Sequence, residues 1–142
     1  MSAAYPGPTV IPCLRYRDAH AAIAWLDKAF GFTPLLVVPG PENTVVHAEL
    51  SNGNGIIMLG SASRTDNAYG QLMKLPGEIG GFQTQTIYLI VPDADVVYRA
   101  AVDGGAAIVI DLKDEEHGGR GFTCRDLEGH VWSIGTYAPG LG

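Results

Sequence analysis

Two neighbouring polar side chains in the first half of the chain have the types needed for acid–base chemistry. His47 and Glu49 lie in residues 45–50, which read as a β-strand. Residues two apart on a strand emerge on the same face, about 7 Å apart at Cα. The pair could bind a polar ligand, run acid–base chemistry with the carboxylate raising the pKa of the imidazole, or contribute to a metal site. It could equally be an exposed pair on an edge strand.

The other candidates for chemistry are weaker. Cys13 and Cys124 fall in separate predicted strands without a Cys-x-x-Cys spacing, which argues against a zinc knuckle or a redox dithiol and predicts free thiols. The glycine-rich run at 118–121 lacks the Gly-Lys-Ser/Thr ending of a phosphate-binding loop and opens a strand instead of a helix. The remaining histidines lie at a predicted helix start or in turns: His20, His117 and His130.

The elements that must position these residues occur twice along the chain. A shift of 75 residues aligns residues 10–61 with residues 85–136 without a gap, and Asp18 falls on Asp93. Few residues are identical under this shift, so the order of elements and the matched polarity indicate the repeat. Each half is predicted to run strand, Asp-capped helix and three strands. The predicted strands are 9–16, 32–38, 45–50, 55–59, 85–91, 107–112, 119–125 and 130–137. The predicted helices are 19–30 and the segment that Asp93 caps, which runs through residue 103.

Strand alternation predicts which side chains face away from the helices. If Ile87, Leu89 and Val91 pack on the helices, Thr86 and Tyr88 face the opposite side. The same alternation turns Cys13, Arg15, Met58 and Ser133 to that side, and Trp132 to the helical layer. Arg120 and Phe122 fall on Val45 and His47 under the 75-residue shift, but their facing stays open because apolar residues favour opposite faces of this strand in the two halves.

Two motifs near the ends of the chain resemble the vicinal oxygen chelate superfamily. Leu14-Arg15-Tyr16-Arg17-Asp18, followed by Trp25-Leu26 and Gly31-Phe32, is similar to the opening of that superfamily. Arg125-Asp126-Leu127-Glu128-Gly129-His130-Val131-Trp132-Ser133 is similar to the DPxGxxW ending of its glyoxalase and bleomycin-resistance-like branch. The resemblance covers about residues 9–138. It implies one α+β domain over 1–142, with βαβββ modules at about 9–61 and 84–138 and a linker or lid at 62–83. The eight strands would form an incomplete barrel around a pocket, with helices outside.

The resemblance also identifies where a metal would be held. Metal-dependent members carry His or Glu on the first and last strands of each module. In this chain those positions hold Ile11, Met58, Thr86 and Ser133. An alkyl group, a thioether and two neutral hydroxyls are poor ligands for a divalent metal. We therefore expect no metal and no other cofactor, and glyoxalase or dioxygenase chemistry would lack its Lewis acid.

The charge and hydropathy of the sequence exclude some classes of binding partner. The net charge of −6 and nine scattered Lys and Arg residues make nucleic acid an unsuitable partner. A cationic small molecule would be easier to accept, although acidic charge is also an ordinary route to solubility. The sequence has no apolar run of the roughly 20 residues that span a bilayer, and residues 1–8 resemble a flexible arm more than a secretory signal. We expect a cytoplasmic protein without membrane contact.

The leading hypothesis is metal-independent binding of a small organic molecule, similar to bleomycin-resistance-like sequestration and antibiotic resistance, by a homodimer. The expected ligand-binding residues are His47, Glu49, Met58, Thr86, Tyr88, Arg120 and Ser133. One alternative is a lyase, isomerase or dioxygenase-type enzyme that uses His47 and Glu49 as an acid–base pair or as relocated metal ligands. Another is a partner-binding module whose dimer face matters more than its pocket.

Overall fold

The computed structural model describes residues 6–63 and 67–140. The first five residues of the predicted arm, and residues 64–66 of the predicted lid, lie outside this range. The chain divides into two compact units, and each is described by itself. Unit 1 is formed by the chain up to Asp27 and by Gly31–Met73, whereas unit 2 is formed by Lys28–Phe30 and the chain from Lys74 onward.

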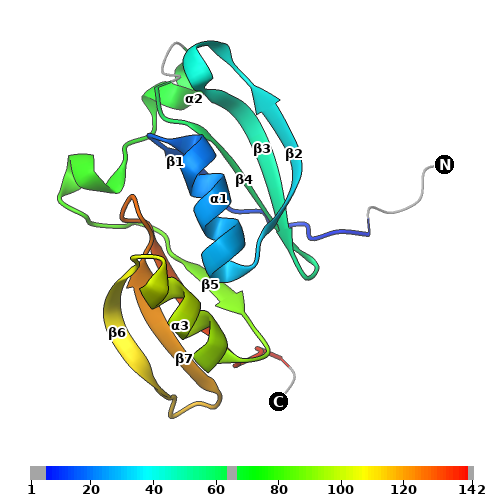
Figure 1. Cartoon of the computed structure of the whole chain (residues 1–142), viewed down its shortest axis with the longest axis vertical. Helices are drawn as coiled ribbons and strands as arrows, with labels where there is room; N and C mark the ends of the chain where they lie inside the picture. The colour runs from blue at the N-terminus through cyan, green and yellow to red at the C-terminus, as the bar shows by residue number, and fades with distance from the viewer. Residues whose placement is uncertain (1–5, 64–66, 141–142) are drawn as a thin grey trace. The chain divides into compact units, whose positions relative to one another are not determined.

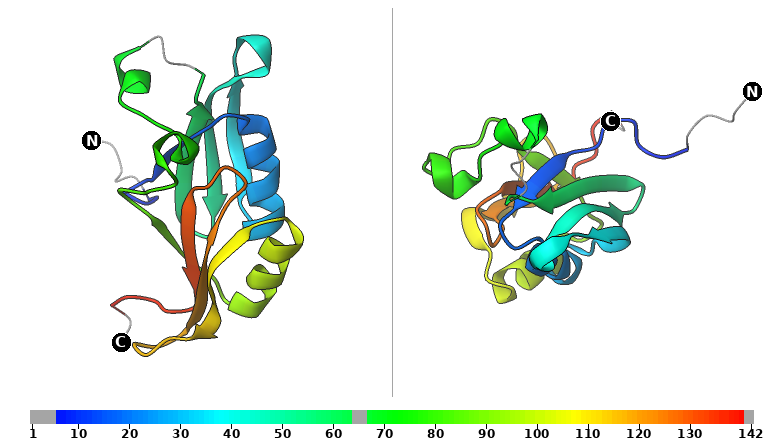
Figure 2. Two further views of the ribbon diagram at one scale, coloured as in Figure 1. Left: turned by 90° about the vertical axis from the view of Figure 1, so that its left-hand side faces the viewer. Right: turned by 90° about the horizontal axis from the view of Figure 1, so that it is seen from above.

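Unit 1 is built on an open four-stranded sheet (Figure 1). Its strands lie in the order β1-β4-β3-β2, with β1 parallel to β4 and the other pairs antiparallel. Helix α1 runs along one face of this sheet (Figure 2). The elements are β1 (Cys13–Tyr16), α1 (Ala19–Phe30), β2 (Thr33–Pro39), a short 3-10 turn (Pro41–Asn43), β3 (Val45–Asn52), β4 (Gly55–Ser61) and a one-turn helix α2 (Ala68–Gln71).

Local sequence signals explain where α1 and the β3–β4 hairpin begin and end. The Asp18 carboxylate accepts a hydrogen bond from the Ala21 amide at 3.0 Å, which caps α1. Gly31 ends the helix in the left-handed region, at φ 84°. Gly53 has φ 58° in the tight turn between β3 and β4, a conformation that favours glycine.

Unit 2 repeats this arrangement. Its sheet order is β5-β8-β7-β6, again with one parallel pair, between β5 and β8. Asp93 caps α3 by accepting hydrogen bonds from the Asp95 and Val96 amides. The elements are a short 3-10 turn (Pro76–Ile79), β5 (Ile87–Ile90), α3 (Ala94–Asp103), β6 (Ala107–Asp114), β7 (Arg120–Arg125) and β8 (Val131–Gly135).

The structure therefore confirms the α+β class and the two βαβββ modules. The parallel ladders repeat at the predicted spacing: Cys13 pairs with Met58 and Tyr88 with Ser133, and 88 − 13 and 133 − 58 are both 75. The first strand of each unit is shorter than predicted. Because β1 begins at Cys13 and β5 at Ile87, Ile11 and Thr86 lie before their strands.

Each sheet has a closed face and an open face. In unit 1 the buried side chains alternate with accessible ones along β1, β3 and β4. The buried set includes Leu14, Tyr16, Ala48, Leu50, Ile57 and Leu59. In unit 2 Trp132 is fully buried, as predicted. No helix in the described part of the chain is long and apolar enough to cross a membrane.

Candidate functional site

The open face of the unit 1 sheet gathers the polar side chains of three strands into two rows. In the first row Cys13 of β1 pairs with Met58 of β4, and Met58 pairs with Glu49 of β3. In the second row Arg15 pairs with Gly60. Side chains of paired residues emerge on the same face of a sheet. This pairing explains why strand alternation assigned Cys13, Arg15 and Met58 to the same face.

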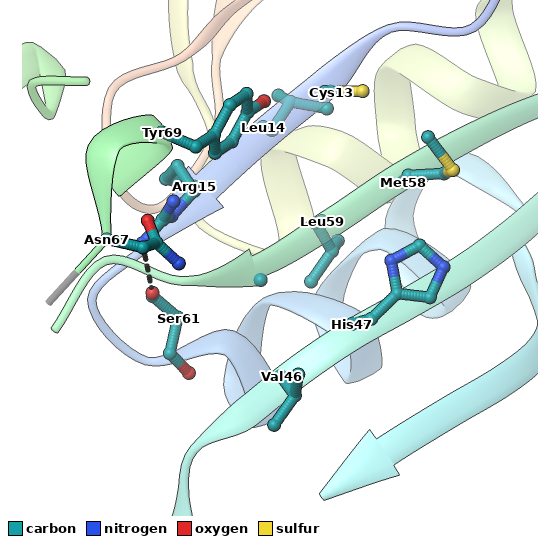
Figure 3. Close-up of a pocket in the computed structure, with 11 residues that line it drawn as sticks. Cys13, Leu14, Arg15, Val46, His47, Met58, Leu59, Ser61, Asn67 and Tyr69 are labelled. Carbon is teal, nitrogen blue, oxygen red and sulfur yellow. Dashed lines mark hydrogen bonds between the residues drawn. The ribbon is translucent and has the colours of Figure 1, made fainter. Parts of the chain in front are cut away.

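A pocket of about 400 Å³ lies on this open face (Figure 3). Strands β1, β3 and β4 supply its floor, and the segment after β4 supplies one wall. Its lining mixes apolar, sulfur-containing and polar groups: Cys13, Leu14, Arg15, Val46, His47, Met58, Leu59, Gly60, Ser61, Asn67 and Tyr69. This size and mixture are typical of a site for a small organic molecule.

His47 and Glu49 form the hydrogen-bonded pair that the sequence suggested. The Nε2 atom of His47 lies 2.8 Å from Oε2 of Glu49. The side chains are 38% and 37% exposed, so solvent partly screens the pair and its contribution to stability is small. Only His47 is among the residues that line the pocket. Glu49 therefore contacts an imidazole of the pocket lining without lining the pocket itself.

Arg15 and Tyr69 form the wall opposite His47. One guanidinium nitrogen of Arg15, Nη2, donates a 2.8 Å hydrogen bond to the Ser61 carbonyl (Figure 3). The ring of Tyr69 lies over the guanidinium, with its centroid 5.9 Å from Cζ, which is within cation–π range. Asn67 caps α2 by accepting a hydrogen bond from the Gly70 amide at 2.7 Å. This cap holds the helix that carries Tyr69 beside the sheet.

Strand β3 carries an extra residue, Val46, next to His47. In unit 1 the Val45 amide donates to the Ser61 hydroxyl, and Ala48 pairs with Leu59. The two β3 residues between these contacts, Val46 and His47, therefore lie opposite Gly60 alone. This two-against-one count is a β-bulge, a feature that re-aims side chains.

In unit 2 the corresponding contacts lack the extra residue. The Arg120 amide donates to the Thr136 hydroxyl, Phe122 pairs with Ile134, and Gly121 alone lies opposite Gly135. The bulge corrects one sequence prediction. Phe122 corresponds to Ala48 instead of His47. This shift explains why, under the 75-residue alignment, the apolar residues of β3 and β7 favoured opposite faces of their sheets.

Three other predicted residues line a separate, smaller pocket within unit 2. Tyr88, Arg120 and Ser133 border this cavity of about 220 Å³. Tyr88 donates its hydroxyl to the Tyr137 carbonyl at 2.8 Å, and burial is the main cause that raises the pKa of Tyr88. The Ser133 hydroxyl is 2.8 Å from that of Thr123. Unit 2 therefore has the hydroxyl groups of Ser133 and Thr123 at the positions where unit 1 has the thioether of Met58 and the carboxylate of Glu49.

Arg120 is held by two carboxylates of its own unit. Its Nε donates to Asp95 at 2.8 Å and its Nη1 lies 3.3 Å from Asp114, and these hydrogen bonds raise the pKa of Arg120. The contacts tie the start of β7 to α3 and to the end of β6. Arg120 borders the unit 2 pocket while it anchors these elements.

The structure does not bring all seven predicted ligand-binding residues to one pocket. Glu49 and Thr86 line neither of the two pockets described above, and Thr86 precedes β5. Asn67 and Tyr69 line the unit 1 pocket but were not predicted individually. The only sequence signal for them was the length of the segment after β4, which was interpreted as a lid.

The two cysteines are free thiols in contrasting environments. Cys13 is exposed at the pocket and Cys124 is buried. Burial, with a smaller contribution from the charge of Asp126, raises the pKa of Cys124 to about 12. Reactivity toward electrophiles requires the thiolate, so Cys124 is expected to be inert in the folded protein.

Thiol labelling checks this contrast. Under native conditions at pH 8 we expect iodoacetamide to modify one thiol per chain, at Cys13 by peptide mass spectrometry, and both thiols only after unfolding. Because the folded pKa of Cys124 lies above that of an ordinary thiol, the unfolded chain loses this proton first as pH rises. The contribution of Cys124 to stability is then complete below about pH 9 and disappears as the pH approaches 12. Rapid native labelling of Cys124 would contradict the assignment.

The positions at which related proteins hold a metal do not suit one here. Met58 offers a thioether from the middle of β4, and the Ser133 hydroxyl is bonded to Thr123. Ile11 has no donor atom in its side chain, and Thr86 offers a neutral hydroxyl. Among residues 6–63 and 67–140, no group of three or more His, Cys, Asp or Glu side chains is placed to hold a metal ion. The donor set therefore does not fit the divalent metals that imidazole and carboxylate ligands bind.

Comparison with known proteins establishes the family. The model of the Glyoxalase/Bleomycin resistance protein/Dioxygenase superfamily matches residues 9–134. The chain belongs to this superfamily. Among curated proteins, an uncharacterized protein of Mycobacterium tuberculosis is 34% identical over 128 residues, which cover 90% of this chain and 74% of that protein. An uncharacterized protein of Mycobacterium bovis has the same identity over 128 residues, covering 90% of this chain and 82% of its own length.

Several solved structures share the fold of this chain. TioX from Micromonospora sp. ML1 is 30% identical with a TM-score of 0.71, over 93% of this chain and all of that chain. The fosfomycin resistance protein FosX from Mesorhizobium loti superposes with a TM-score of 0.63 at 12% identity, over 93% of each chain. At that identity the likeness to FosX concerns the fold alone.

Proposed function

We propose that this superfamily member binds a small organic molecule in the unit 1 pocket without using a divalent metal. The pocket volume of about 400 Å³ lies within the range of about 300–1,000 Å³ that is usual for small-molecule sites. The apolar side chains of Met58 and Val46 supply burial, while His47, Arg15 and Asn67 supply polar contacts. This is the binding role of the bleomycin-resistance-like branch that the sequence resembles.

The observation that carries the proposal is the chemical type of one side chain that lines the pocket, Met58. Met58 occupies a position at which metal-dependent relatives have His or Glu, and it lies between Cys13 and Glu49 in the sheet. A thioether is soft, flexible and apolar, so it favours contact with an organic ligand over coordination of a hard divalent ion.

A binding screen combined with metal analysis tests the proposal. The purified protein is titrated by calorimetry against planar and drug-sized organic molecules of all charge types, before and after chelator treatment. We expect saturable binding of at least one class, unaffected by the chelator, and less than stoichiometric Zn, Ni, Fe and Mn by mass spectrometry. Stoichiometric metal that is required for binding, or no saturable ligand, would overturn the proposal.

Tyr69 provides a test of the pocket itself. Its side chain is 52% exposed and belongs to a one-turn helix, so Tyr69→Ala should change stability little. Loss of an aromatic wall should weaken ligand binding about tenfold, since aromatic contacts contribute about 0.5–1.5 kcal/mol beyond burial. Phe82→Ala, at a 78% exposed aromatic in unit 2, is the matched control and should bind normally. Equal affinities of the two variants would place the ligand elsewhere.

The His47–Glu49 contact supports a second candidate, an enzyme that uses this pair for acid–base chemistry. A carboxylate 2.8 Å from a ring nitrogen orients a histidine as it does in general bases. Turnover separates the two functions. A ligand found in the screen is incubated with stoichiometric protein and recovered: an unchanged ligand supports binding alone, and a changed mass or hydrogen exchange at carbon supports catalysis.

The proposal includes assembly as a homodimer, which the resemblance implied. Sedimentation velocity at micromolar concentration is expected to give one species of about twice the 15.0 kDa chain mass. A single monomeric species across this concentration range would contradict it.

A further inference from the structure

We infer that the unit 1 pocket selects a planar ligand with a weakly acidic hydroxyl group, phenolic or enolic, and that this hydroxyl binds Nδ1 of His47. The inference rests on the proposed function, because it names the ligand chemistry of the same pocket. Three observations carry it: the orientation of the imidazole, the glycine at the corresponding position of unit 2, and the bare backbone of Gly60.

The contact with Glu49 fixes which nitrogen of His47 is available to a ligand. An ionised carboxylate only accepts hydrogen bonds, so the 2.8 Å contact places a proton on Nε2 of His47. The other nitrogen, Nδ1, is then an acceptor in the neutral ring and a donor in the protonated ring. Figure 3 shows the ring standing on β3, with one nitrogen on the side of Leu59 and the other turned away from it.

A weakly acidic hydroxyl matches both states of this imidazole. As a neutral phenol or enol it donates to Nδ1 of the neutral ring. If the proton passes to Nδ1, the resulting phenolate or enolate accepts from the imidazolium, whose second proton faces Glu49. The proton count of the complex is the same in both descriptions, and no bond to carbon changes. A methyl ether has no proton to donate to the neutral ring, and its uncharged oxygen accepts from the protonated ring only weakly.

The floor of the pocket favours a flat body for this ligand. Gly60 pairs with Arg15, so the open face has a position without a side chain beside the guanidinium. Its backbone is already crowded, because a Cβ atom here would lie 3.0 Å from the Val46 carbonyl oxygen. Met58 and Tyr69 also line the pocket and can contact the faces and edges of a ring.

The two units differ at the sheet position that His47 occupies in unit 1. The two units share register along their parallel strand pairs, yet β3 has one residue more than β7 beside the pocket. Unit 2 has Gly121 in the corresponding place, which offers no side chain. Of the two described pockets, only that of unit 1 therefore has an imidazole at this position of the sheet.

Three matched probes test this selection: 4-nitrophenol, 4-nitrobenzyl alcohol, which has a hydroxyl that is not acidic, and 4-nitroanisole, which is the methyl ether. Dissociation constants are measured at pH 7 by calorimetry. We expect 4-nitrophenol to bind about tenfold more tightly than 4-nitroanisole, with the alcohol between them. A tenfold difference in affinity is what one good hydrogen bond contributes. Bound nitrophenol should also show a changed visible absorbance, because the imidazole shifts its phenol–phenolate balance.

Variants assign the effect to the named residues. His47→Gln should bring 4-nitrophenol and 4-nitroanisole to equal affinity, and Glu49→Gln should reduce the difference because the ring is no longer oriented. His117→Gln, at the histidine of the unit 2 pocket, should keep the tenfold preference. Near-ultraviolet circular dichroism confirms that each variant is folded, and the absorbance change provides a second readout in the wild type.

The outcomes separate this inference from the proposed function. Equal binding of the phenol and its ether by the wild type, an undiminished preference in His47→Gln, or no binding of any of the three probes would overturn the inference. The proposed function survives those results if another class of molecule binds saturably in the broader screen. It fails only if that screen also yields no ligand.

Discussion

Replacing Asp126 by alanine is expected to lower the free energy of unfolding by about 3 kcal/mol, because a buried network loses its shared acceptor. The Asp126 side chain is 5% exposed. Its carboxylate accepts from the amides of Glu128 and His130 and from Nε1 of the fully buried Trp132, at 3.0–3.1 Å. Alanine would leave these donors in the β7–β8 turn without that acceptor.

Urea unfolding followed by tryptophan fluorescence measures this effect. Asp103→Ala, an exposed residue at the end of α3 in the same unit, is the control and should change stability by less than about 0.5 kcal/mol. Asp126→Asn should fall between the two, because its carbonyl oxygen retains part of the acceptor capacity. Wild-type stability of Asp126→Ala would show that the turn is not held by this carboxylate.

Gly60→Val is expected to weaken ligand binding at least about 100-fold and to lower stability by about 2 kcal/mol. A Cβ atom at Gly60 would lie 3.0 Å from the Val46 carbonyl oxygen, so the added side chain presses on the bulge at Val46, next to His47. The branched methyl groups would also occupy the floor of the pocket. Both effects reduce binding, one by filling space and the other by moving the imidazole.

The control for this substitution is Gly77→Val. A Cβ atom at Gly77 meets nothing within 4 Å, and the residue is exposed in unit 2. Binding by calorimetry and thermal unfolding should match the wild type for Gly77→Val. If Gly60→Val also binds like the wild type, the ligand does not lie over β4.

Most of the fold could be predicted because its signals are local. Asp18 and Asp93 cap the two helices in the predicted places, and the Asn-Gly turn at 52–55 joins β3 to β4. The 75-residue register held along the parallel strand pairs. Strands β1 and β5 were predicted too long, since the sequence shows where extended residues lie but not where a neighbouring strand begins to pair with them.

The site was predicted less completely because it depends on register and on contacts distant in sequence. The spacing of His47 and Glu49 predicted their common face correctly. The bulge beside them shifts half of β3 by one residue, and its only sequence signal was the conflict in facing between Phe122 and His47. Nothing local indicated that Asn67 and Tyr69 would be placed beside Arg15, since that contact depends on how the segment after β4 folds back.

The central claim, that the unit 1 pocket is the ligand site, is tested most directly by nitrogen-15 NMR chemical-shift mapping with the tightest ligand from the screen. We predict that the largest saturable shifts occur at the amides of Arg15, His47, Gly60 and Tyr69, whereas Gly53 and Gly77 stay unchanged. Shifts that saturate elsewhere, or none that saturate at these residues, would contradict the account.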